Sequence, residues 1–185
     1  MNTILQQELK KILNGRFSQS ESTRLNYSRG EDTYDPILSK AVVFPETNEE
    51  VSKILKLCNE HKVPVVPFGT GTSLEGNVVG NDKGITISLE KMNKILTVNT
   101  QDFDCRVQAC VTREQLNDYL REDGVFFPID PGANAAIGGM ASTSASGTMA
   151  VKYGTMKTVI TGLTVVLPNG CLLYTSDAAD EGLGV

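Results

Sequence analysis

The sequence has no tryptophan, a single histidine and only four cysteines in 185 residues, and these scarcities limit the kinds of site it can form. The cysteines lack the close pairwise spacing of metal ligands, so we predict no metal site. We interpret them as reduced structural thiols of a cytoplasmic-type compartment. They are Cys58, Cys105, Cys110 and Cys171.

Basic charge and long apolar runs are also scarce. The formal net charge is −5, whereas a nucleic-acid surface normally needs a basic face, so we predict no nucleic-acid partner. The longest apolar runs, such as residues 41–44 and 63–66, have the length of strands and fall far short of the roughly 18 residues that cross a bilayer. We therefore predict no membrane span and expect a cytoplasmic protein, with peripheral association with a membrane left open.

The N-terminal residues 1–36 are predicted to form a helix followed by an extended arm. An amphipathic helix that docks on the protein and ends near Gly15 is favoured, and a surface anchor or targeting helix is the alternative. Glu8 and the lack of an apolar core argue against a signal peptide. Residues 26–39 have no apolar periodicity and are expected to form the arm. The apolar stripe of the helix consists of Ile4, Leu5, Leu9, Ile12 and Leu13.

Residues 41–66 are typical of a minimal β-α-β unit. A short apolar strand ends at Pro45, and Thr47 with Glu50 three residues later is a capping-box pattern that begins a helix. A second apolar strand follows at residues 63–67. A glycine-rich loop begins where this strand ends, which is the place where ligands collect in open α/β sheets.

The region that follows has a different character. Residues 84–111 alternate over short runs, as in antiparallel strands joined by a turn at residues 99–102. Thr112 begins a further helix that ends near Gly124, and residues 159–170 form a strand that runs into an Asn-Gly turn. We predict an α+β fold in two lobes, a small β-α-β lobe and a larger lobe of antiparallel strands and helices. Both glycine-rich segments would then be available to line a shared cleft.

The first glycine-rich segment is VVPFGTGTSLEG, residues 65–76. It is not a Walker A loop, because Asn77 and Val78 stand where lysine and a hydroxyl residue are required. It is not a Rossmann turn either, because Leu74 replaces the third glycine. Its amides and hydroxyls could form an anion nest that holds a diphosphate, and a plain tight turn is the alternative.

The second glycine-rich segment is DPGANAAIGGMASTSASG, residues 130–147, which has four glycines and almost no charge. Small residues there would allow the backbone to approach a flat ligand closely. A closely packed interface of glycine and alanine between the lobes is the alternative. The segment by itself leaves both interpretations open.

Three motifs together resemble the FAD-linked oxidoreductases of the p-cresol methylhydroxylase/vanillyl-alcohol oxidase type, in particular the branch of cytochrome-linked D-lactate dehydrogenase and glycolate oxidase. The resemblance covers about residues 25–170 and implies a PCMH-type FAD-binding domain at residues 37–170 of a C-terminally truncated chain. The motifs are VPVVPFGTGTSLEG, FFPIDPGANAAIGGMASTSASGTMAVKYGTMK and VITGLTVVLPNG.

This resemblance also implies which residues would bind FAD. The diphosphate would lie against the first glycine-rich segment, the second segment and the residues after it would line the rest of the cleft, and backbone near Ile160 would meet the adenine. The resulting cofactor-binding residues are Gly69, Thr70, Gly71, Thr72, Ser73, Pro131, Gly132, Ile137, Gly138, Gly139, Thr143, Ser144, Ser146, Gly147, Tyr153, Gly154 and Ile160.

Non-covalent FAD is expected, because covalent attachment in the wider superfamily uses a histidine or a cysteine and the first glycine-rich segment contains neither. The only histidine, His61, stands at the end of a helix, where the dipole favours it, and is not interpreted as a catalytic base. Related enzymes carry their substrate-binding domain beyond the region present here. We therefore assign no catalytic residue.

The activity that the resemblance implies is a flavin-dependent D-2-hydroxy-acid dehydrogenase that acts on a D-lactate-like small molecule. A hydride would pass from substrate to flavin, and a quinone, a cytochrome or another acceptor would reoxidise the flavin. The fragment alone is expected to be inactive. The alternatives are a non-enzymatic nucleotide-binding module and another flavin alcohol or sugar oxidase of the same superfamily.

The C-terminal segment CLLYTSDAADEGLGV, residues 171–185, departs from the family pattern. Its residues through Glu181 can be back-translated into a transposon-based sequencing adaptor. We therefore interpret the segment as non-biological, and a divergent acidic segment is the alternative. It contains three acidic and no basic residues, so its removal would change the net charge from −5 to −2.

Overall fold

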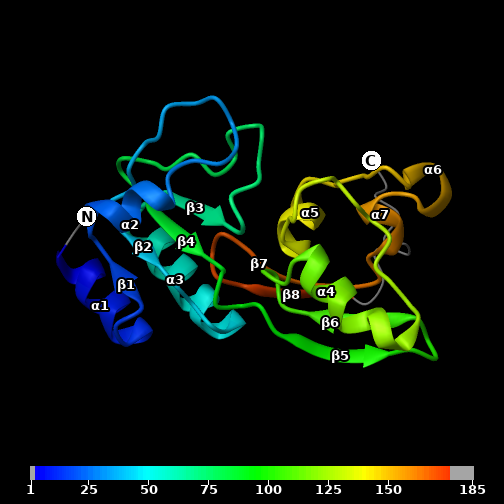
Figure 1. The fold of residues 1–185 in the computed structure, drawn as a ribbon. Coiled ribbons are helices and arrows are strands. Elements are labelled where there is room, and N and C mark those ends of the chain that lie inside the picture. Colours follow the sequence, from blue (N-terminus) through cyan, green and yellow to red (C-terminus); the bar gives the residue numbers. More distant parts are fainter. Residues whose placement is uncertain (1–2, 176–185) are drawn as a thin grey trace, which may run out of the picture. The chain divides into compact units, whose positions relative to one another are not determined.

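The computed structural model describes residues 3–175 and divides them into two units (Figure 1). Unit 1 contains residues 3–92 and 166–172, and unit 2 contains residues 93–165 and 173–175. The boundary that the sequence suggested at residue 36 falls inside unit 1. Each unit has its own hydrophobic core and is described by itself.

A four-stranded sheet organises unit 1, with the strand order β1-β2-β4-β3. The first strand is antiparallel to β2, whereas β2 and β3 are both parallel to β4. The two strands of the predicted β-α-β unit are therefore parallel as expected, but β4 lies between them. The strands are β1 (Phe17–Ser18), β2 (Val42–Val43), β3 (Val65–Phe68) and β4 (Ile85–Ser88).

The place of β4 corrects the prediction that all of residues 84–111 form antiparallel strands. The alternation of apolar and hydroxyl residues favoured an antiparallel strand, but all four residues of β4 are buried. Burial of the hydroxyls is possible because they have partners: the hydroxyl of Thr86 donates to the hydroxyl of Ser39 over 2.8 Å. Strand β4 is therefore a central strand with a parallel neighbour on each side, a position that buries both of its faces.

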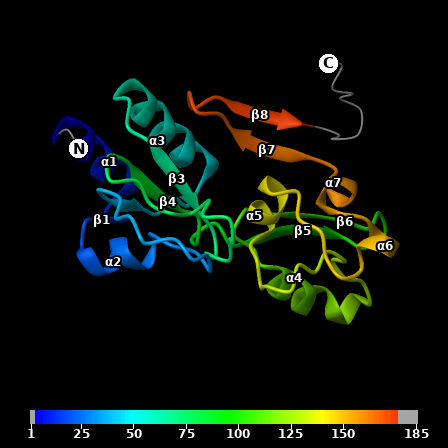
Figure 2. The same ribbon diagram turned by 90° about the horizontal axis from the view of Figure 1, so that it is seen from above.

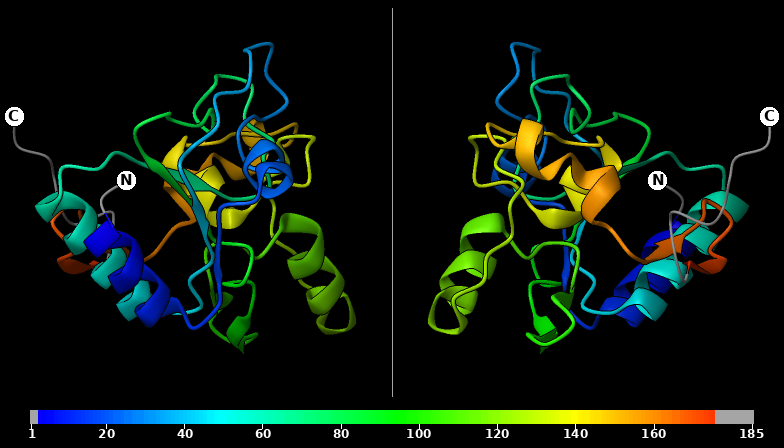
Figure 3. Two further views of the ribbon diagram at one scale, coloured as in Figure 1. Left: turned by 90° about the vertical axis from the view of Figure 1, so that its left-hand side faces the viewer. Right: turned by 90° about the vertical axis from the view of Figure 1, so that its right-hand side faces the viewer.

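Two helices lie side by side, and their apolar residues pack with those of the sheet in the core of unit 1 (Figures 1 and 3). Helix α1 (Thr3–Leu13) buries Leu5, Leu9 and Leu13 completely, which confirms a docked amphipathic helix, although Ile4 from the predicted stripe is 58% exposed. Helix α3 (Asn48–Glu60) buries Ile54 and Cys58 against the same core.

A short helix and an irregular arm connect β1 to β2. The helix, α2 (Glu21–Asn26), was not predicted and begins at a serine cap, in which the hydroxyl of Ser20 accepts a hydrogen bond from the amide of Thr23. Residues 27–41 have no helix or strand, as predicted for the arm. Among residues 3–175, no helix has the length and hydropathy needed to span a membrane.

The beginning of α3 is fixed by a cap and an ion pair. The hydroxyl of Thr47 accepts a hydrogen bond from the amide of Glu50, as predicted. The carboxylate of Glu50 does not complete the capping box on Thr47, because it accepts from the amide of Glu46 at 2.8 Å and from both terminal nitrogens of Arg16 at 2.6 and 2.7 Å. The guanidinium thereby holds the pKa of Glu50 below its ordinary value.

Unit 2 is built on the antiparallel pair β5 and β6, joined by a turn at the predicted place, and on α4, whose Thr112 cap was also predicted. Gly124 has a φ of 70° and ends the 3₁₀ turn that follows α4. The elements are β5 (Ile95–Asn99), β6 (Asp104–Val107), α4 (Arg113–Leu120), η1 (Arg121–Asp123), α5 (Ile137–Ser142), α6 (Ala150–Tyr153) and α7 (Met156–Val159).

The last two strands, β7 (Leu163–Val166) and β8 (Leu172–Thr175), pair with each other, as Figure 2 shows. The predicted Asn-Gly turn connects them, and Gly170 adopts a φ of 83° there. Strand β8 is formed by residues that we interpret as non-biological from the sequence. The rest of that segment, residues 176–185, lies outside the described residues.

Replacement of Glu50 by glutamine is expected to lower the free energy of unfolding by about 1 kcal/mol at neutral pH, because it removes the charge from a half-buried bidentate pair. The pKa of Glu50 is lower in the folded protein, so the contribution is present above the ordinary carboxyl pKa and is lost as the pH falls through the folded-state value. Urea unfolding of both proteins across this acidic range measures the difference. Glu49→Gln, an exposed neighbour, is the matched control, and equal losses in the two variants would contradict the assignment.

Candidate functional site

The first glycine-rich segment lies in unit 1, and its glycines follow the carboxyl end of β3, as predicted. We call residues 69–76 the glycine loop. The ring of Phe68, the last residue of β3, is buried and packs edge to face on Tyr27 with ring centroids 5.1 Å apart. Gly71 has a φ of 75°, and a Cβ there would lie 2.9 Å from the ring of Phe68. The loop can therefore turn back over the strand end only because this residue is glycine.

The glycine loop presents unpaired hydrogen-bond donors. Among residues 3–175, no acceptor receives the backbone amides of Gly71, Thr72 or Ser73. The hydroxyls of Thr70 and Thr72 lie 3.4 Å apart, and the hydroxyl of Ser73 accepts from the amide of Glu75. Backbone amides are normally paired, so successive free amides at the end of a strand form a place where an anion can bind.

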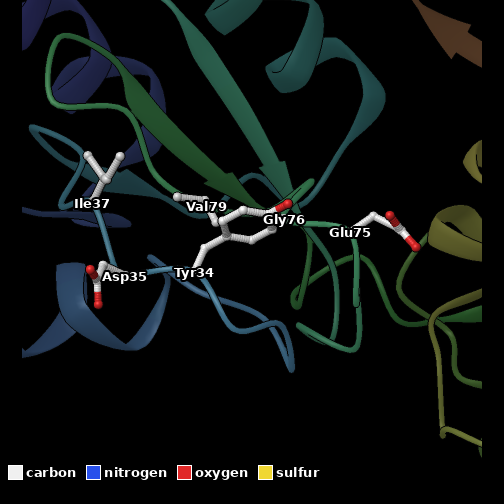
Figure 4. A pocket seen from close by; sticks show the side chains of 6 residues that line it. All are labelled: Tyr34, Asp35, Ile37, Glu75, Gly76 and Val79. Carbon is white, nitrogen blue, oxygen red and sulfur yellow. The ribbon is translucent and has the colours of Figure 1, made fainter.

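A cavity of about 360 Å³ lies beside the glycine loop in unit 1 (Figure 4). The ring of Tyr34 lies over Gly76, and the side chains of Asp35 and Glu75 belong to its lining. The lining has two acidic residues and no basic one, so this cavity does not suit the phosphate groups of a dinucleotide. The full lining is Tyr34, Asp35, Ile37, Glu75, Gly76 and Val79.

The second glycine-rich segment lies in unit 2, where it forms the helix α5 and the turns on either side. The amides of Ile137 and Gly138 each donate over 2.8 Å, the first to the carbonyl of Val111 and the second to that of Ala109. These two predicted site residues therefore use their amides inside unit 2. Gly139 differs, because no atom lies within 4 Å of the place where its Cβ would be.

The turn before α5 is held by Asp130. Its carboxylate accepts a hydrogen bond from the amide of Gly132 over 3.0 Å, and Nε of Arg113 lies 3.5 Å from the same oxygen. Gly132 has a φ of 90°, and Pro131 is exposed. The predicted residues Pro131 and Gly132 thus lie at the surface, in a turn whose conformation is fixed by the carboxylate of Asp130.

The segment after α5 combines exposed hydroxyls with one very close backbone contact. Thr143 donates from its hydroxyl to the carbonyl of Gly139 over 3.1 Å, whereas Ser144 and Ser146 are exposed. A Cβ on Gly147 would lie 2.2 Å from the carbonyl oxygen of Asp130. Close packing therefore explains Gly147, and it does not explain the exposed serines.

The last predicted residues have mainly structural contacts in unit 2. The ring of Tyr153 packs edge to face on Phe126 with centroids 5.6 Å apart, and Gly154 ends α6 with a φ of 80°. Ile160 packs against Met156 and donates its amide to the carbonyl of that residue over 3.1 Å. The amide of Ile160 is thus already paired.

The comparison with protein families decides what the site belongs to. The family model described as "FAD binding domain" matches residues 39–176 of this chain. This span contains both glycine-rich segments. The chain belongs to the FAD-binding domain family. The family predicted from the three motifs is thereby confirmed.

Several curated proteins are similar to this FAD-binding domain in sequence. It is 45% identical over 159 residues to "Probable D-lactate dehydrogenase, mitochondrial" of Danio rerio, covering 86% of this chain and 32% of that protein. It is 41% identical to "D-lactate dehydrogenase [cytochrome], mitochondrial" of Arabidopsis thaliana (93% and 31%) and 33% identical to "Glycolate oxidase subunit GlcD" of Bacillus subtilis (86% and 34%). The chain spans about a third of the length of these relatives.

Solved structures support the predicted α+β fold of a PCMH-type domain. Alkyldihydroxyacetonephosphate synthase matches with a TM-score of 0.85 at 22% identity, covering 95% of this chain and 34% of that one. p-Cresol methylhydroxylase matches with a TM-score of 0.78 at 24% identity, covering 98% and 36%. At this identity the likeness establishes the fold alone.

The predictions about His61, the cellular location and the cysteines can also be compared with these findings. His61 forms the C-cap of α3, as predicted. Two of the relatives above are named as mitochondrial proteins, which does not fit the predicted cytoplasmic location.

Residues 3–175 contain no cluster of three or more potential metal ligands. Burial raises the pKa of the Cys58 thiol to about 11, so this cysteine is a structural thiol.

Sequence reasoning missed two residues of the arm that contact the glycine loop, Gly30 and Tyr34, and a third, Asp32, that holds them. A Cβ on Gly30 would lie 2.6 Å from the carbonyl oxygen of Ser73, and Tyr34 covers Gly76. Asp32 stands between the two arm residues and binds the amides of both. The available signal was an aspartate within a polar stretch that contains a glycine, which is typical of a side chain that binds the backbone two residues away.

Alanine at two neighbouring glycines of α5 is expected to have opposite effects on stability. Gly138→Ala should lower the free energy of unfolding by about 1–3 kcal/mol, because its Cβ would lie 2.8 Å from the Cβ of Ala109. Gly139→Ala should leave it unchanged or raise it by up to about 1 kcal/mol, because the new methyl has open space and alanine favours a helix. Denaturant unfolding of the two variants tests the pair, and equal destabilisation would contradict it.

Proposed function

We propose that this chain is the FAD-binding part of a flavin-dependent dehydrogenase that oxidises D-lactate or a closely related D-2-hydroxy acid. The observation that carries the proposal is the family match across residues 39–176, which includes both glycine-rich segments. The names of the similar proteins from Danio rerio and Arabidopsis thaliana support the substrate class. When bound, the flavin would accept a hydride from the substrate, and a quinone, a cytochrome or another acceptor would reoxidise it.

The glycine loop is proposed to hold the diphosphate of FAD. The free amides of Gly71, Thr72 and Ser73 would donate to the phosphate oxygens, and the hydroxyls of Thr70 and Thr72 could add further donors. Neither lysine nor a metal ion is needed for this kind of binding. The donors lie on a loop that is fixed at the strand end by Gly71.

The second glycine-rich segment is proposed to bind FAD mainly at its exposed residues. Gly139 has open space at its Cα, so the backbone of α5 could approach a flat ligand closely there. Ser144 and Ser146 are exposed and could donate hydrogen bonds from their hydroxyls. Gly138, Gly147 and Ile160 would contribute by shaping the segment, because their contacts lie inside unit 2. The remaining proposed contacts are Gly69, Pro131, Gly132, Ile137, Thr143, Tyr153 and Gly154.

Purified 185-residue chain is expected to bind FAD, and Gly139→Ala is expected to weaken binding about tenfold or more while the variant stays folded. The physical reason is that a methyl forced into a close contact with the ligand costs about 1–3 kcal/mol. Isothermal titration with FAD measures both affinities. Ser142→Ala, on the same helix, is the matched control and should bind FAD like the wild type. A folded chain that takes up no FAD would defeat the proposal and leave a non-enzymatic module as the better description.

FAD bound to this chain is expected to be non-covalent. Precipitation of the loaded protein with acid should release all of the flavin absorbance into the supernatant, because the glycine loop offers neither a histidine nor a cysteine for attachment. Flavin retained in the washed precipitate would contradict this part of the proposal.

We also propose that residues 171–185 are encoded by a sequencing adaptor. Amplification of the source gene across codon 170 is expected to recover a different downstream reading frame. Recovery of the codons for CLLYTSDAADEGLGV from the gene itself would show that the segment is natural.

A further inference from the structure

The arm of unit 1, residues 27–41, runs along the loop that follows β3, and both rise on the same side of the sheet (Figure 1). The arm is fastened near both of its ends. The carbonyl of Ser28 accepts a hydrogen bond from the amide of Gly80 over 3.1 Å, and the hydroxyl of Ser39 accepts from the amide of Asn81 over 3.1 Å. Ser28 and Ser39 are both fully buried, so these ends of the arm belong to the core of unit 1.

Between these ends, Gly30 lies against the carbonyl side of the glycine loop. A Cβ on Gly30 would lie 2.6 Å from the carbonyl oxygen of Ser73 and 3.0 Å from that of Gly71. In a trans peptide, the carbonyl and the following N–H point in opposite directions. The contact with Gly30 therefore turns the amides of Thr72 and Leu74 away from the arm.

Those two amides are available to a ligand. Neither the amide of Thr72 nor that of Leu74 donates to an acceptor in the part of the chain that the structure describes. The side of the loop that faces the arm carries carbonyl oxygens, which would repel an anion. The opposite side carries the amides of Thr72 and Leu74, so the orientation of these two peptides decides whether these donors face a phosphate.

Asp32 holds the arm in the conformation that makes this contact. One carboxylate oxygen accepts from the amide of Gly30 over 3.2 Å, and the other accepts from the amide of Tyr34 over 3.0 Å. The ring of Tyr34 in turn lies on Gly76, where a Cβ would be 2.7 Å from the ring carbons (Figure 4). One side chain thus fixes the two arm residues that contact the glycine loop at Ser73 and at Gly76.

We propose that Asp32 is a positioning residue for the diphosphate loop. Through Gly30 and Tyr34 it keeps the carbonyls of Gly71 and Ser73 turned toward the arm and the following amides turned outward. Asp32 itself lies behind the loop and donates nothing to the ligand. The identity of the ligand as FAD rests on the proposed function, whereas the coupling of the arm to the loop does not.

Three variants of the 185-residue chain test the role of Asp32. Asp32→Ala removes both acceptor oxygens and should weaken FAD binding about tenfold, in line with the loss of two hydrogen bonds that fix the loop. Asp32→Asn keeps one acceptor oxygen and should lose less. Glu31→Ala is the matched control, because it removes an equal charge from the neighbouring exposed residue and should bind FAD like the wild type.

Affinity is measured by titration at a temperature where circular dichroism shows every variant to be folded. Backbone ¹⁵N relaxation of residues 69–76 without ligand is the second measurement, and Asp32→Ala should lower the order parameters of this loop. A merely stabilising role for Asp32 would lower the unfolding midpoint and leave both the FAD affinity of the folded chain and the loop order unchanged, and that result would overturn the inference. Should Asp32→Ala not fold, Asp32→Asn is measured against Glu31→Ala in the same way.

The two proposals fail differently. A wild-type chain that binds no FAD would defeat the proposed function, and the relaxation measurement would still decide whether Asp32 orders the loop. A wild-type chain that binds FAD, together with an Asp32→Ala variant that binds it equally well, would overturn the positioning role and leave the proposed function standing.

Discussion

Pairing on both sides of β4 is the interaction on which unit 1 depends. This strand lies between β2 and β3, so it joins the part of the chain before α3 to the part after it. Its two hydroxyl residues are buried, and the hydroxyl of Thr86 binds Ser39 at the end of the arm. Because the arm is tied to the central strand, it stays beside the loop that leaves β3. The position of the candidate diphosphate loop is therefore a consequence of the sheet order.

The glycines of the two segments serve different physical purposes. Gly71, Gly138 and Gly147 are required by the protein itself, since a Cβ at each would collide with Phe68, Ala109 or the backbone of Asp130. Gly139 is different, because its surroundings in unit 2 are open. Close packing inside unit 2 therefore accounts for Gly138 and Gly147, whereas close approach of a ligand stays a prediction for Gly139.

Several parts of the fold could be predicted because they depend on local chemistry. The caps at Thr47 and Thr112 follow from a hydroxyl that binds an amide three residues later, and the buried stripe of α1 follows from helical periodicity. The α+β fold and the family followed from three motifs in the right order. The share of the site that was missed lies in the arm, because its contacts join residues about forty positions apart and leave no periodic pattern in the sequence.

The sequence by itself determined where the glycine loop begins, which phosphate-binding motifs it cannot be, and which family it belongs to, since these depend on residue identity and short spacing. Only the tertiary structure decided that β4 is a central parallel strand, that Gly30 and Tyr34 contact the loop, and that the amides of Ile137 and Gly138 are already paired. The physical reason is the same in each case. Strand pairing and backbone contacts between distant residues are set by the packing of the whole unit, and the same local sequence is compatible with either outcome.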